Sequence, residues 1–107
     1  MAIDDLAQLV DEAARTAIEI PQLADSHELT VDEAYAIQAL SIRRRLERGE
    51  KLIGMKMGLT SRAKMVQMGV SDVIWGRLTD AMRVEDGDNI HFEKFVNPRV
   101  EPEIAFL

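Results

Sequence analysis

The hydrophobic pattern of the chain changes its period at Gly49, and this change limits the fold to a mixed one. Before Gly49, apolar residues recur every three or four positions, as on one face of an amphipathic helix. After Gly49, they come in short runs bounded by glycine, which is typical of β-strands. Helices followed by strands predict an α+β fold. We expect residues 1–49 to form an N-terminal helical region and residues 50–107 to form the first part of a β-rich core.

The helical region divides into two predicted helices with different end signals. The first spans residues 3–20, because Pro21 cannot continue a helix. Thr30 and Glu33 have the T-x-x-E spacing of a capping box, in which each residue pairs with the backbone N–H of the other. This box starts the second helix, which we predict over residues 31–48.

Several short segments in the second half predict the remaining elements. Residues 51–57 predict a strand, residues 62–68 a short helix, and residues 73–78 a strand or a tight turn. Asp86-Gly87 stands between two apolar runs, which is a hairpin signal. Residues 104–107 are apolar without a break, as in a strand buried on both faces.

Charge and composition exclude several classes of protein. The chain has 13 Lys and Arg against 19 Asp and Glu, a net charge of −6, whereas nucleic-acid binding needs a basic surface. Four arginines do cluster in the sequence, namely Arg43, Arg44, Arg45 and Arg48. Because Glu47 and Glu50 lie nearby, we interpret this cluster as a solvated helix face. The absence of cysteine excludes disulfides and thiolate metal sites.

No segment has the composition of a membrane span or of a signal peptide. The first residues are acidic, and no apolar run approaches the roughly 18 to 20 residues that a span needs. We therefore expect a cytoplasmic protein that does not enter a membrane.

Glu101 and Glu103 are the strongest candidates for a metal site. On an extended chain, side chains two residues apart leave the same face. Two carboxylates held close together repel each other unless a cation lies between them, and Mg²⁺ or Mn²⁺ suits such oxygen ligands. The alternative from spacing alone is an exposed pair on a solvated strand.

Two other charged residues have two interpretations each. Lys56 lies among apolar residues in the middle of a predicted strand, so its side chain either points to solvent or is held in a site. Asp80 follows an apolar segment, where it is either a turn residue or part of a site.

Three segments of the chain resemble the fumarylacetoacetate-hydrolase superfamily, within its hydratase and decarboxylase branch. They are G-M-K-M-G-L-T-S at residues 54–61, W-G-R-L-T-D-A-M at residues 75–82 and P-R-V-E-P-E-I-A-F at residues 98–106. The resemblance runs over nearly the whole chain and is greatest to the 4-oxalocrotonate (2-oxo-3-hexenedioate) decarboxylases.

The resemblance implies a fold and a set of site residues. The helical pair is expected to precede strands that begin the mixed β fold of the superfamily. The implied site consists of Lys56 and Asp80 as catalytic residues, Ser61 and Leu78 as substrate-binding residues, and Glu101 and Glu103 as ligands of Mg²⁺ or Mn²⁺. Family members are more than twice as long, and their third carboxylate ligand lies beyond the position of Leu107, so we expect the 107-residue chain alone to be inactive.

The resemblance also implies an activity and partners. The expected reaction is the decarboxylation of 2-oxo-3-hexenedioate, a small 2-oxo dicarboxylic acid, to 2-hydroxypenta-2,4-dienoate in the meta-cleavage degradation of aromatic compounds. The expected partners are 2-hydroxypenta-2,4-dienoate hydratase and further copies of the same chain. Two alternatives remain open: the hydratase activity itself, and a non-catalytic fragment that only contacts the partner hydratase.

Overall fold

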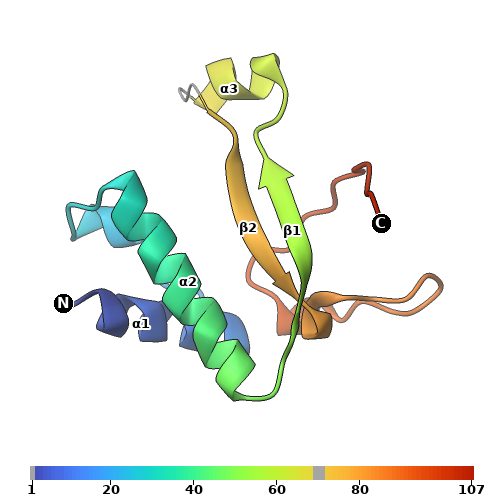
Figure 1. Ribbon diagram of the computed structural model, residues 1–107, viewed down its shortest axis with the longest axis horizontal. Helices are drawn as coiled ribbons and strands as arrows, with labels where there is room; N and C mark the ends of the chain where they lie inside the picture. The colour runs from blue at the N-terminus through green and yellow to red at the C-terminus, as the bar shows by residue number, and fades with distance from the viewer. Residues whose placement is uncertain (1, 69–71) are drawn as a thin grey trace.

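The computed structural model describes residues 2–68 and 72–107, which fold into a pair of helices beside a two-stranded hairpin (Figure 1). The helices and strands are α1 (Ile3–Thr16), α2 (Val31–Glu47), β1 (Leu52–Gly58), α3 (Arg62–Met68) and β2 (Ile74–Thr79). Short 3-10 turns lie at Leu23–Asp25, Asp80–Met82 and Phe92–Lys94. Helices come first and strands follow, so the predicted α+β class is confirmed.

The hydrophobic core lies between α1 and α2. Leu6 and Ala7 of α1 pack against Ile37 of α2, and all three are buried. A ring of partly buried residues surrounds them: Ile3, Val10, Leu23, Leu29 and Leu40. Packing of these two amphipathic faces accounts for the stability of the helical pair better than helix propensity does.

The two predicted helix boundaries have different outcomes. The capping box at Thr30 is confirmed, because Thr30 Oγ1 accepts a 3.1 Å hydrogen bond from the backbone N–H of Glu33. The predicted end of the first helix is wrong, since α1 stops at Thr16 rather than at residue 20. Ala17 adopts a left-handed conformation with φ of 55°, and Ile18 N–H donates to Ala13 O at 3.1 Å. Pro21 therefore sets the last possible end of the helix, and the left-handed cap ends it earlier.

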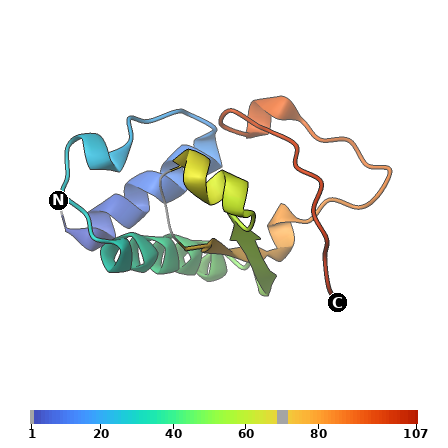
Figure 2. The same ribbon diagram turned by 90° about the horizontal axis from the view of Figure 1, so that it is seen from above.

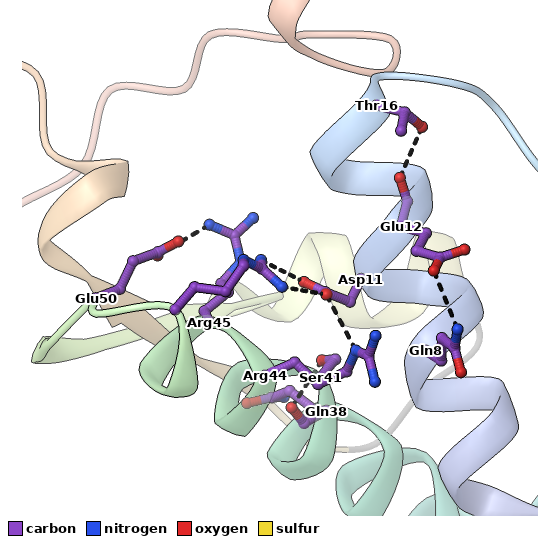
Figure 3. Close-up of polar contacts among 10 residues, drawn as sticks. Gln8, Asp11, Glu12, Thr16, Gln38, Ser41, Arg44, Arg45 and Glu50 are labelled. Carbon is purple, nitrogen blue, oxygen red and sulfur yellow. Dashed lines mark hydrogen bonds and ion pairs between the residues drawn. The ribbon is translucent and has the colours of Figure 1, made fainter.

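The arginine cluster on α2 is not a solvated face, and that interpretation is corrected. Asp11 of α1 is 2% exposed, and Arg48 donates to both of its carboxylate oxygens at 2.6 and 2.9 Å. Arg44 Nε adds a third bond at 3.2 Å (Figure 3). These bonds, led by those from Arg48, hold the pKa of Asp11 below its ordinary value although burial acts to raise it. Arg43 alone fits the earlier interpretation, since it forms an exposed pair with Glu47.

Strands β1 and β2 form an antiparallel hairpin, which confirms both as strands. Lys56 lies opposite Gly76, and Gly54 lies opposite Leu78. Residues two apart on one strand and residues directly opposite each other share a face of the sheet. Lys56 therefore shares its face with three glycines, Gly54, Gly58 and Gly76.

Two side chains of α2, Gln38 and Tyr35, join the helical pair to the outer edge of β2. Gln38 Nε2 donates to the carbonyl oxygen of Trp75 at 3.0 Å, and Gln38 Oε1 accepts from the backbone N–H of Arg77 at 3.1 Å. Gln38 thus satisfies backbone groups that a neighbouring strand would otherwise pair. The Tyr35 ring stacks on the Trp75 ring with centroids 4.8 Å apart, and the Arg77 guanidinium carbon lies over the Trp75 ring, 4.7 Å from its centroid.

Replacing Gln38 by Ala is expected to destabilise the chain by about 1–3 kcal/mol, because the bonded groups of Trp75 and Arg77 would lose their partner in a partly buried place. Urea unfolding followed by Trp75 fluorescence measures the change. The matched control is Gln8→Ala, which removes an exposed hydrogen bond to Glu12 and is expected to lower the free energy of unfolding by less than about 0.5 kcal/mol. Equal losses in the two variants would contradict the role given to Gln38.

Two predictions for the last 25 residues are wrong. Asp88 N–H closes a turn to Glu85 O at 3.0 Å, and Gly87 has a φ of 90°, but no strands flank this turn. The apolar flank before this turn, Arg83-Val84, is too short to form a strand ladder.

Residues 97–107 form no strand either: they cross the open side of the hairpin as an irregular segment (Figure 2). Ile104 is 86% exposed and Phe106 is 92% exposed. Their apolar pattern indicated a need for burial without specifying a neighbouring strand.

Across the described residues, no helix combines the length and the apolar character that crossing a membrane requires.

Candidate metal centre

A cavity of about 380 Å³ lies between the end of β1 and the C-terminal segment. It brings together four of the residues singled out in the sequence: Lys56, Ser61, Glu101 and Glu103. The rest of its lining is mostly apolar and consists of Met57, Gly58, Leu59, Thr60, Ile74 and Pro102. One strand end and a distant loop therefore supply charged groups to the same space.

Lys56 and Glu103 form an ion pair across this cavity. Lys56 Nζ lies 3.8 Å from Glu103 Oε1, and the two side chains are 47% and 44% exposed. A pair this exposed and this long contributes little to stability, because water screens it. Its importance is geometric, since it shows that the Lys56 ammonium reaches the carboxylate predicted to bind metal.

Glycines surround Lys56 on its face of the sheet. This feature was not predicted, although the spacing of the glycines around Lys56 in the sequence indicates it. Gly54 and Gly58 stand two residues before and after Lys56, so all three leave one face of β1. Gly76 completes this face from β2, and a Cβ built there would lie 3.8 Å from Lys56 Cγ. The stem of Lys56 therefore lies across the backbone at Gly76, and the other side chains on this face come from Ile74, opposite Gly58, and Leu78, opposite Gly54.

The oxygen donors present fit part of a magnesium site. Glu101 and Glu103 line the same cavity, and carboxylate oxygens are the ligands that Mg²⁺ prefers. Among the described residues, no three Asp, Glu, His or Cys side chains gather closely enough to hold an ion by themselves. Mg²⁺ usually keeps several waters and binds through one or two carboxylates together with its substrate, so two glutamates are a suitable partial donor set.

Asp80 and Leu78 lie outside the lining of this cavity. Asp80 Oδ1 accepts from Lys51 N–H at 2.9 Å, and Asp80 N–H donates to Lys51 O at 2.9 Å. Lys51 is five residues from Lys56, or about 16 Å along a strand. The contacts of Asp80 thus secure the far end of the hairpin. Leu78 is half-buried on the same face as Lys56, opposite Gly54.

Comparison with known proteins identifies the relatives of this chain. No family model matches it. The chain is 55% identical over 107 residues to a 4-oxalocrotonate decarboxylase of Pseudomonas sp, matching all of this chain and 42% of that protein. It is 44% identical over 103 residues to the 4-oxalocrotonate decarboxylase of Pseudomonas putida, and 36% identical over 103 residues to the 2-oxo-hept-4-ene-1,7-dioate hydratase of Escherichia coli. Each of these two matches covers 95% of this chain and 39% of the relative.

Solved structures agree with the sequence matches. The 4-oxalocrotonate decarboxylase from Pseudomonas putida G7, complexed with magnesium and adipate, superimposes with a TM-score of 0.70 at 41% identity, over 74% of this chain and 30% of that chain. The same enzyme complexed with calcium and acetate gives the same TM-score and identity, over 74% of this chain and 31% of that chain.

The chain belongs to the hydratase and decarboxylase branch of the fumarylacetoacetate-hydrolase superfamily. It corresponds to the N-terminal portion of these relatives, and the 4-oxalocrotonate decarboxylases compared above are more similar to it than the hydratase is.

Proposed function

We propose that this chain is the N-terminal part of a metal-dependent carboxy-lyase that converts 2-oxo-3-hexenedioate to 2-hydroxypenta-2,4-dienoate. One observation carries the proposal: Lys56, Glu101 and Glu103 line a single cavity in a chain 55% identical to a 4-oxalocrotonate decarboxylase. The mixed β fold of the superfamily, which needs more strands than the hairpin provides, is part of the same proposal.

The reaction places specific demands on the site. When the bond between C5 and the terminal carboxylate breaks, its electron pair moves through the conjugated chain to the 2-oxo oxygen, and CO₂ leaves. A bound Mg²⁺ or Mn²⁺ would supply Lewis-acid stabilisation of that oxygen. Glu101 and Glu103 would hold the ion, and the Lys56 ammonium would donate a hydrogen bond to the developing anion. Ser61 and Leu78 would contribute to substrate binding, and Asp80 would act through the hairpin that carries Lys56.

The choice of metal rests on the donor set and on the relatives. Two carboxylates with room for water and a chelating 2-oxo acid suit a hard, six-coordinate cation. Solved relatives hold magnesium in one complex and calcium in another. We infer that Mg²⁺ is the working ion and that Mn²⁺ can replace it.

The hydratase reaction is the second candidate, because a hydratase of the same branch matches 95% of this chain at 36% identity. The complete protein, with every residue that its gene encodes, should be incubated separately with 2-oxo-3-hexenedioate and with 2-hydroxypenta-2,4-dienoate. Release of CO₂ from the first substrate supports the decarboxylase. Loss of diene absorbance from the second, without CO₂ from the first, would replace it with the hydratase.

Association with a partner hydratase, and with further copies of the same chain, belongs to the proposal as well. Co-purification of the complete protein with 2-hydroxypenta-2,4-dienoate hydratase tests the first association, and sedimentation of the complete protein alone tests the second. Co-purification together with zero turnover would support a role restricted to contact with the hydratase.

Glu103→Gln in the complete protein is expected to weaken Mg²⁺ binding about tenfold or more, because it keeps the side-chain shape but removes a ligand charge. Activity should return at high metal concentration, which a titration of rate against Mg²⁺ measures. Glu93→Gln is the matched control, since Glu93 is also exposed in the C-terminal region and lies outside the cavity lining. Full activity of Glu103→Gln without added metal would exclude this glutamate as a ligand.

A further inference from the structure

The Lys56 ammonium contacts the carboxylate that the proposed function gives to the metal. Lys56 Nζ is 3.8 Å from Glu103 Oε1, within the range of an ion pair. A divalent cation bound to that carboxylate would stand close to the ammonium, and two cations that close repel each other. Glu103 therefore has two competing counter-ions, one built into the chain and one drawn from solution.

The surroundings of Lys56 leave its side chain free to take a second position. Gly54, Gly58 and Gly76 share its face and offer no side chain. A Cβ built at Gly54 would meet nothing within 4 Å, so the space beside Lys56 is open on that side, whereas a Cβ built at Gly58 would meet Ile74 Cγ1 at 3.0 Å. Gly54 and Gly76 also lack the positive φ that would require glycine, and glycine weakens a strand. The glycines on this face are therefore better explained by the space they leave for movement of the Lys56 side chain, or for a ligand, than by a backbone conformation that only glycine can adopt.

We propose that Lys56 is an internal counter-cation that holds Glu103 in the metal-free protein and turns to the 2-oxo acid when metal is bound. This inference rests on the proposed function. Lys56 then has opposite effects on two affinities, lowering the affinity for the metal and raising the affinity for the 2-oxo acid. Its charge opposes the binding of metal, because the ammonium must first leave Glu103, and it favours the binding of the anionic 2-oxo acid afterwards.

The test measures these two binding steps separately in the complete protein, without turnover. Free Mn²⁺, followed by electron paramagnetic resonance, gives the metal dissociation constant. The saturated diacid 2-oxoadipate, added at saturating Mn²⁺, gives the ligand dissociation constant by calorimetry. For Lys56→Met we expect Mn²⁺ to bind about two- to fivefold tighter at low ionic strength, the scale of one exposed ion pair, with less change at high salt. We expect 2-oxoadipate to bind about tenfold weaker or more.

Two control variants make the result specific. Lys51→Met removes the same charge from the same hairpin about 16 Å away and should leave both constants unchanged. Lys56→Arg keeps the charge and should hold Mn²⁺ affinity within about twofold of the unsubstituted protein. Tighter Mn²⁺ binding in Lys51→Met as well would assign the effect to net charge and overturn the inference.

The outcomes separate this inference from the proposed function. If Glu103→Gln weakens Mn²⁺ binding while Lys56→Met leaves it unchanged or weaker, the metal site stands and the inference is wrong. If the unsubstituted protein binds no Mn²⁺, or if Glu103→Gln changes nothing, the proposed metal site fails and the inference fails with it.

Discussion

Lys56→Met in the complete protein is expected to lower turnover of 2-oxo-3-hexenedioate by about a hundredfold or more while the fold stays intact. The loss is the usual scale for removing one preorganised group that faces charge developing in the transition state. Methionine keeps the length of the lysine stem, which lies across Gly76, and removes the ammonium. Turnover at saturating Mg²⁺ and saturating substrate measures the effect on the chemical step.

The control for this variant is again Lys51→Met, since Lys51 precedes the same strand and pairs with Asp80 through its backbone. Its turnover should stay near that of the unsubstituted protein. Circular dichroism and thermal melting of both variants establish that folding is unchanged. Near-normal turnover of Lys56→Met would show that this ammonium faces solvent during the reaction.

Asp11→Asn is expected to destabilise the protein by about 2–3 kcal/mol. Asn keeps the shape of the side chain but removes the charge that compensates Arg44 and Arg48. Breaking one side of a fully buried ion pair costs about 3–5 kcal/mol, and we expect less here because both arginines are partly exposed. Urea unfolding measures the change. Glu12→Gln on the exposed side of the same helix is the control and should cost under about 0.5 kcal/mol.

The Asp11 variant should also change the response of stability to acid. The pKa of Asp11 is lowered in the folded protein by its hydrogen bonds to Arg48. Its stabilisation is therefore complete above the pKa of an unfolded aspartate, about 4, and is lost as the pH falls toward the lower folded pKa. The free energy of unfolding of Asp11→Asn should fall less steeply below about pH 4. Parallel curves for the two proteins would contradict the lowered pKa.

Elements whose signals are local could be predicted from the sequence, and elements that depend on distant partners could not. Thr30 and Glu33 specify the start of α2 within one turn, and the prediction is confirmed. The burial of Asp11 depends on two arginines more than 30 positions away, and no local pattern distinguishes them from solvated charges. The apolar run at residues 104–107 indicated a buried strand, but a strand needs a neighbour, and these residues are exposed.

The candidate site shows the same limit. The spacing of Glu101 and Glu103 and the resemblance brought these residues and Lys56 forward, and the structure places all three along one cavity. Asp80 was proposed as catalytic from the resemblance, and its contacts are with the backbone of Lys51 at the other end of the hairpin. Which residues face Lys56 depends on the register between β1 and β2, which the sequence alone did not specify.

The contact between Gln38 and β2 has a consequence for how the helical pair finds its position. A strand presents the same donor and acceptor at its edge every second residue, so one carboxamide would fit equally well two residues further along. The hydrogen bonds of Gln38 therefore do not by themselves determine the register of α2 on β2. The stacking of Tyr35 on Trp75 determines it, because these two rings can meet in one register only. The hydrogen bonds of Gln38 attach α2 to β2, and the stacked pair of Tyr35 and Trp75 determines the register in which they attach.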